Sequence, residues 1–241
     1  MATYQIITLN IAKDMKTTIK TLIFIKIFIT YCTVNAVTDQ FIRLTDMVKV
    51  TNESDEWLKV TVSFEVVNHP LKKKYDSIKT PSGKDQVINL NFLNNVKVRL
   101  SICFSNVLQK EKLRRSSLPD AEFYQYYSSE IEFLTLRADR NKKYVSFLFP
   151  SAIAERDGFK GNYIKPVGYV VDIIYDGIPL EISNNIYFDK YKEDSILAKF
   201  RQMCQTNSSK NEGILIPAHI INPSQYLQGL GPVKRKSGSG Y

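Results

Sequence analysis

A strict alternation of apolar and polar residues constrains the fold of this chain more than any other feature. In WLKVTVSFEV, residues 57–66, the even-numbered positions are apolar and most of the odd-numbered positions are polar. Side chains on a β-strand point alternately to its two faces, so this pattern indicates a half-buried strand with one wet face. The inward side is predicted to hold Leu58, Val60, Val62, Phe64 and Val66.

The same alternation recurs further along the chain. VKVRLSICF, residues 96–104, predicts a second half-buried strand. Its inward side is predicted to hold Val96, Val98, Leu100, Ile102 and Phe104. In EIEFLTLRA, Ile131 and Phe133 start on the inward face, and the phase then changes to Leu134 and Leu136, which indicates a bulge.

Further strands are predicted where the sequence is less amphipathic. Residues 143–149 and 167–175 are apolar enough for central strands, and residues 41–50 are expected to begin the domain. Asp176-Gly177 supplies the two positive-φ positions of a type I′ turn and predicts a hairpin. Pro179 then places the second arm of that hairpin at a sheet edge.

These strands, with few helices between them, favour a mainly β fold: an antiparallel immunoglobulin-like β-sandwich. A short helix is expected near 150–158, with Ser151 as its cap and Gly158 as its left-handed stop. A C-terminal amphipathic helix is expected near 192–205, followed by an extended segment through Pro217 and Pro223. The apolar stripe of the amphipathic helix consists of Ile196, Leu197, Phe200, Met203 and Cys204.

The N-terminal region has the layout of a secretory signal peptide. Lys16 and Lys20 precede an apolar run over 22–31, and TVNA ends at Ala36. The run is shorter than the roughly 20 apolar residues of a membrane-spanning helix. The alternative is a buried strand, because LIFIKIFI is rich in β-branched and aromatic residues.

The organisation predicted from these features has three parts. Residues 1–36 form a signal peptide, with a start codon assigned too early before Met15; residues 37–230 form the β-sandwich domain with its C-terminal helix; and residues 231–241 form a flexible basic tail. The mature protein is expected to be periplasmic or secreted and to contain no transmembrane helix.

Charge and cysteine content each leave two alternatives open. The chain carries a formal net charge of +9, with basic clusters at 71–75, 109–115, 140–143 and 233–236. Such clusters are typical of solvated loops, but a basic surface also suits nucleic acid or another anionic polymer. Cys103 and Cys204 would remain after signal cleavage, either as a disulfide or as two buried thiols.

No catalytic, metal-ligating or cofactor-binding residue is predicted. The sequence lacks the common nucleophile, zinc-protease, P-loop and dinucleotide motifs. Two histidines, His69 and His219, do not make a typical zinc site, and each is interpreted as a surface or packing residue. Glu130 and Glu132 share a strand face, which leaves a two-acid envelope-polymer hydrolase as a third hypothesis.

One stretch resembles a known family. FLFPSAIAERDGF, followed by KPVGYVVDIIYDGIPL, is similar to exported immunoglobulin-like β-sandwich proteins encoded with type IV pilus machinery in verrucomicrobia-like bacteria. The resemblance covers residues 146–180 best and 96–104 and 213–217 more loosely. It implies a role in pilus assembly or envelope organisation without catalysis, with an envelope or pilus protein as partner, and it transfers no functional residues.

The short helix offers the most specific candidate contacts. Glu155, Arg156 and Asp157 would be presented to a partner at one end of the sandwich, or the helix would only plug the core. The leading hypothesis is a non-enzymatic exported protein of the cell envelope that works by binding, and the runner-up is a polyanion-binding protein.

Cleavage after Ala36 is the first testable prediction. The exported fraction should yield a mature protein beginning at Val37 on N-terminal sequencing, because the residues before the site match a signal peptide. Intact chains that begin at Met1 or Met15 and are recovered from the cytosol would restore the buried-strand alternative.

Overall fold

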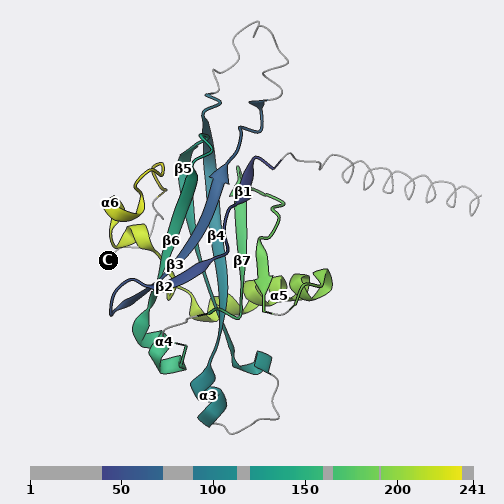
Figure 1. The fold of residues 1–241 in the computed structure, drawn as a ribbon, viewed down its shortest axis with the longest axis vertical. Coiled ribbons are helices and arrows are strands. Elements are labelled where there is room, and N and C mark those ends of the chain that lie inside the picture. Colours follow the sequence, from purple (N-terminus) through teal and green to yellow (C-terminus); the bar gives the residue numbers. More distant parts are fainter. Residues whose placement is uncertain (1–39, 73–88, 113–119, 160–164, 190, 235–241) are drawn as a thin grey trace, which may run out of the picture. The chain divides into compact units, whose positions relative to one another are not determined.

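The computed structural model describes residues 40–72, 89–112, 120–159, 165–189 and 191–234. These residues form a mainly β structure of two antiparallel sheets with a shared hydrophobic core (Figure 1). The mainly β antiparallel prediction is confirmed at this level. The predicted signal peptide lies outside the described residues.

The first sheet has the order β1-β3-β6-β10, and β2 also pairs with β3. Its strands are β1 (Ile42–Leu44), β2 (Lys49–Asn52), β3 (Trp57–Val66), β6 (Lys142–Pro150) and β10 (Ile216–Pro217). The second sheet has the order β5-β4-β7-β8, and β9 also pairs with β7. Its strands are β4 (Phe92–Ser105), β5 (Tyr124–Arg137), β7 (Gly168–Tyr175), β8 (Ile178–Pro179) and β9 (Ile186–Phe188).

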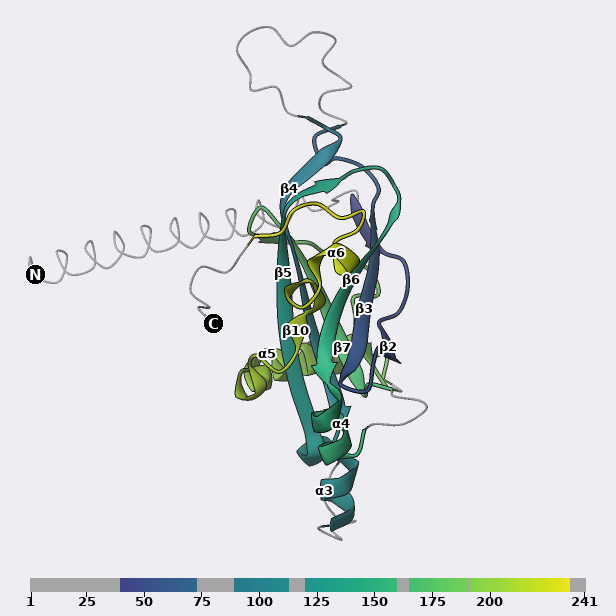
Figure 2. The same cartoon turned by 90° about the vertical axis from the view of Figure 1, so that its left-hand side faces the viewer.

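Short helices connect and cover the strands. The described residues include four α-helices, α3 (Val107–Lys112), α4 (Ser151–Asp157), α5 (Asp194–Asn207) and α6 (Pro223–Tyr226), and three 3-10 helices, η1 (Asp120–Phe123), η2 (Ser208–Asn211) and η3 (Ala218–Ile220). In both views α3 and α4 lie at the same end of the sheets (Figures 1 and 2).

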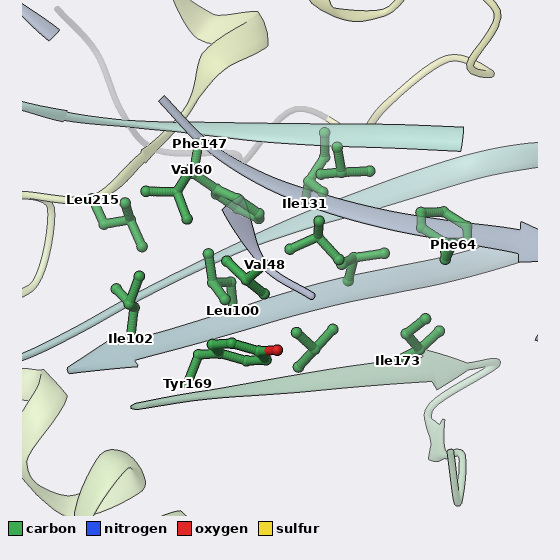
Figure 3. Packing of buried hydrophobic residues seen from close by; sticks show 14 of the residues in the cluster. Val48, Val60, Phe64, Leu100, Ile102, Ile131, Phe147, Tyr169, Ile173 and Leu215 are labelled. Carbon is green, nitrogen blue, oxygen red and sulfur yellow. The ribbon is translucent and has the colours of Figure 1, made fainter. Parts of the chain in front are cut away.

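The core lies between the two sheets, and the alternation predicted its membership correctly (Figure 3). All ten residues predicted to point inward from β3 and β4 are at most 1% exposed. The facing residues of β6 and β7, among them Phe147, Tyr169 and Ile173, complete the layer. Burial of this apolar surface is the main favourable contribution to folding.

The predicted change of phase near residue 134 is present, but it is not a bulge. Leu136 is buried as predicted, but Leu134 is 45% exposed, so the inward position predicted for Leu134 is wrong. The pairing of β4 with β5 nevertheless keeps one register from Phe92↔Arg137 to Ser105↔Tyr124, so no extra residue is inserted. Strand β4 changes phase at the position opposite, where Asn95 has φ of 54°.

The Asp176-Gly177 hairpin is confirmed. Asp176 has φ of 48° and Gly177 has φ of 80°, as a turn with two positive-φ positions requires, and β7 pairs with β8 across it. Pro179 lies in β8, which pairs on one side only with β7, so the edge position predicted for this proline is also correct.

Several helix boundaries differ from the sequence predictions. Pro150 takes the N-cap position of α4, and Ser151 is the first helical residue, so Ser151 is not the cap. Gly158 ends the helix with φ of 77°, as predicted. Pro223 begins α6 instead of keeping that segment extended, because a proline at the first helical turn loses no hydrogen bond.

The ordered contact between the C-terminal segment and the second sheet extends further along the chain than predicted, as far as Lys234. The Leu134 N–H donates to the Pro232 carbonyl at 2.8 Å, and the Lys234 N–H donates to the Glu132 carbonyl at 2.8 Å. Residues 231–234 therefore follow the edge of β5, although they were predicted to belong to a flexible basic tail. Residues 235–241 lie outside the described residues.

Leu100 and Leu134 offer a matched test of the core. Leu100→Ala should lower the free energy of unfolding by about 2–5 kcal/mol, because Leu100 is fully buried between the sheets. Leu134→Ala, at a leucine that is 45% exposed on a neighbouring strand, should change it by about 0.5 kcal/mol or less. Urea unfolding of both variants measures the difference, and equal losses would contradict the assignment of faces.

Candidate functional site

The end of the sheets that carries α4 holds the contact residues predicted from the sequence. The helix follows β6 directly, and the Ser151 N–H donates to the Glu56 carbonyl at 2.8 Å. At its other end the Phe159 N–H donates to the Ala154 carbonyl at 2.9 Å. Ala154 is buried, whereas Ala152, Glu155 and Arg156 are exposed. The helix α4 therefore has one face buried against the protein and one face exposed to solvent.

An aromatic cluster lies at the same end of the core as α4. It consists of Phe104, Tyr127, Phe149 and Phe159. The Phe104 and Phe159 rings stack with centroids 4.6 Å apart, and Tyr127 meets Phe149 edge to face at 4.7 Å. Aromatic pairs in these geometries add to the stability gained from area burial. The helix is thus anchored at a well-packed end of the core.

The structure divides the three predicted contact residues. Asp157 is 4% exposed and accepts two hydrogen bonds from the Arg156 guanidinium, each of 2.8 Å. Burial raises the pKa of the Tyr127 hydroxyl, and the nearby Asp157 carboxylate raises it further. Asp157 is therefore a buried residue that orients Arg156, and only Glu155 and Arg156 remain as exposed candidates for contact with a partner.

The two cysteines meet beneath α5, on the outer face of the second sheet. Cys103 lies between Tyr126 and Gly168 in a row across three strands. A methyl group at Gly168 would come within 2.6 Å of the Phe200 ring, so this glycine makes room for the helix. Cys103, Tyr126, Val170, Phe200 and Cys204 form a second buried cluster. The helix therefore brings both sulfurs into one buried layer.

Both cysteines are free thiols in the structure and are at most 1% exposed. Burial raises the pKa of the Cys204 thiol to about 12 and raises the pKa of Cys103 well above its usual range. Because the thiolate is the reactive form, both sulfurs are protected from oxidants once the helix has packed. The disulfide stays a prediction for the exported chain.

Glu130 and Glu132, the two acids of the hydrolase hypothesis, belong to a ladder of ion pairs on the outer face of the second sheet. Arg99 donates to Glu130 at 2.8 Å, and Lys97 lies 3.2 Å from Glu130 and 3.8 Å from Glu132. Burial alone would raise the pKa of Glu130, but the hydrogen bonds from Arg99 and Lys97 lower it overall. A general acid needs the opposite shift, so this geometry does not favour acid catalysis by Glu130.

A pocket of about 240 Å³ opens at the end of the sheets where β3 ends and β6 begins. It is lined by residues from 67–72, 90–91 and 138–140, and His69 is the most buried polar side chain among them. His69 was predicted only to be a packing or surface residue. The sequence signal for this pocket was the pair of basic clusters at 71–75 and 140–143, but nothing in the sequence showed that Lys72 and Arg140 line one cavity.

The described residues show neither a metal site nor a membrane-spanning helix. Among the described residues no three histidine, cysteine or acidic side chains are placed to share a metal ion. None of the helices in these residues is both long and apolar enough to cross a membrane. Comparison of the chain with protein-family models, with curated proteins and with solved structures finds no significant match.

Thiol accessibility provides a test of the α5 cluster. In protein kept reduced, neither cysteine should react with a thiol reagent near neutral pH while the chain is folded, and both should react after denaturation. Phe200→Ala should make both thiols reactive in the folded state, because it opens the layer that covers them. Rapid labelling of the folded wild-type protein would show that α5 does not cover this face.

Proposed function

We propose that this chain is a non-enzymatic exported protein of the cell envelope that works by binding, within a type IV pilus or a secretion assembly. The proposal includes an immunoglobulin-like β-sandwich as the finer description of the two sheets. Its main sequence support is the signal-like N-terminus together with the resemblance of residues 146–180 to pilus-associated proteins.

The observation that carries the proposal is that α4 is held in a fixed position with one face exposed. A short helix with an exposed face is fixed by backbone hydrogen bonds at both of its ends. Its exposed arginine is held in one orientation by the buried Asp157. Such pre-organisation lowers the entropy cost of association, so a fixed charged surface of this kind suits recognition of a protein partner. The partner is proposed to be an envelope or pilus protein that contacts Glu155 and Arg156.

Site-specific photo-crosslinking in the native cell tests this proposal. A photoreactive residue at Ala152, which is exposed on α4, should crosslink to one pilus or secretion component identified by mass spectrometry. The same residue at Ser183, exposed in the segment between β8 and β9, is the control and should not form that crosslink. Glu155→Lys should abolish the crosslink while leaving the unfolding midpoint unchanged.

Two results would contradict the proposal. One is equal crosslinking from Ala152 and Ser183, which would indicate non-specific proximity. The other is turnover of an envelope polymer by the purified protein, which would establish the hydrolase instead.

One observation favours the polyanion-binding alternative. Acidic and basic side chains are nearly equal in number among the described residues, so the excess positive charge resides in the remaining segments. After signal cleavage these segments still include Lys73, Lys74, Arg114, Arg115 and Arg235. Phosphate contacts from such residues would make nucleic-acid affinity fall steeply with salt. A filter-binding assay that retains neither DNA nor RNA at low salt would exclude this alternative.

A further inference from the structure

The pocket at the end of β3 is built from three segments that backbone hydrogen bonds join. The Ala138 N–H donates to the Asn91 carbonyl at 2.7 Å, and the Arg140 N–H donates to the Val66 carbonyl at 3.1 Å. Arg140 has φ of 59°, a left-handed conformation that is uncommon for residues other than glycine, asparagine and aspartate. The surrounding hydrogen bonds hold it there, so the pocket wall is fixed by more than side-chain packing.

Among the described residues, the charges around the pocket do not balance. Lys143 is buried and donates to the Asp139 carboxylate at 2.7 Å, so this pair is neutral as a unit. Lys72 and Arg140 also line the pocket, and neither forms an ion pair with a carboxylate among the described residues. Two positive charges from basic clusters far apart in the sequence therefore line one cavity, and no carboxylate in the described part of the chain pairs with either.

Several polar groups that line the pocket can donate hydrogen bonds to a ligand. The His69 Nδ1 atom accepts a hydrogen bond from the Leu71 N–H at 3.1 Å, so the neutral ring carries its proton on Nε2. Burial lowers the pKa of His69, which favours this neutral form. Nε2–H, the Lys72 ammonium group and the free N–H groups of Arg140 can then donate to a ligand.

The hydrogen bonds of Arg140 hold its guanidinium in place and leave part of it available to an anion. Its Nε atom donates to the Val67 carbonyl at 3.2 Å, and its Nη2 atom donates to the Asn68 side chain at 3.5 Å. One of the two guanidinium edges is therefore occupied, and the edge formed by Nη1 and the second Nη2 N–H can still donate to two oxygens of an anion. Together with the separate donors of Lys72 and His69, this suits a phosphate group, whose several oxygens can each accept hydrogen bonds.

We propose that this pocket binds a phosphate group through Lys72, Arg140 and His69. The inference goes beyond the proposed envelope function, which relies on α4 at the opposite end of β6. A cavity of about 240 Å³ is larger than one oxyanion, since a cavity of about 150 Å³ already holds benzene, so there is room for the group that carries the phosphate.

The test uses sulfate as a probe and the two histidines as reporters. In the full-length protein at neutral pH and constant ionic strength, added sulfate should shift the imidazole NMR signals of His69 saturably. The signals of His219, in η3, should not move, and they serve as an internal reference. Lys72→Gln should weaken binding roughly tenfold, which is the contribution of one charge-assisted hydrogen bond.

A matched control is Lys112→Gln, at an exposed lysine in α3, which should leave sulfate binding unchanged. Arg140→Gly should weaken binding at least as much as Lys72→Gln, and it keeps the left-handed backbone accessible at this position. The proposal is overturned if neither sulfate nor inorganic phosphate shifts His69. Equal shifts of both histidines, or equal weakening by Lys72→Gln and Lys112→Gln, would overturn it as well.

Two further binding measurements distinguish a free phosphate or small phosphate ester from a lipid headgroup as the ligand. Binding of inorganic phosphate without co-sedimentation on phosphatidylglycerol vesicles assigns the pocket to a free phosphate or a small phosphate ester. Co-sedimentation that Lys72→Gln abolishes, and that phosphatidylcholine vesicles do not support, assigns it to a lipid headgroup. A negative result in all arms leaves the α4 surface and its crosslinking experiment unaffected, so the two proposals fail separately.

Discussion

The burial of β4 on both of its faces is the constraint on which the rest of the structure depends. Its inward residues form the middle of the core between the two sheets. One of its edges pairs with β5 along almost its whole length, and the other pairs with β7 from Val96 to Cys103. Towards its C-terminal end the outer face is also covered, because Cys103 packs under α5. A strand that is buried from several sides fixes the positions of everything that pairs with it.

The two ends of β4 then determine where the candidate sites lie. At one end Phe104 joins the aromatic cluster below α4, which holds that helix in a single position. At the other end the segment just before β4 bonds to the start of the β5–β6 connection through Asn91 and Ala138, and this contact forms one wall of the pocket. Both candidate surfaces are therefore short, irregular segments carried by a rigid framework, which is the usual placement of binding residues.

Electrostatic pairing explains how the outer faces stay charged without adding to the net charge of the sheets. Lys97, Arg99, Glu130 and Glu132 satisfy one another across β4 and β5, and Arg201 pairs with Asp172 at 2.6 Å beside them. Partly exposed pairs of this kind contribute little to stability individually. They do allow a helix such as α5 to lie on a face that carries charged side chains, because each cation has an acidic neighbour within reach.

The sequence by itself determined the inward faces of β3 and β4, the hairpin at Asp176-Gly177 and the left-handed end of α4. Each of these follows from local chemistry, namely the period of a strand or the φ angle that a glycine permits. Only the tertiary structure decided that Lys72 meets Arg140, that Asp157 points into the protein, and that the phase change in β5 is matched in β4. These outcomes depend on which distant segments become neighbours, and a pattern of adjacent residues carries no information about pairing across a long connection.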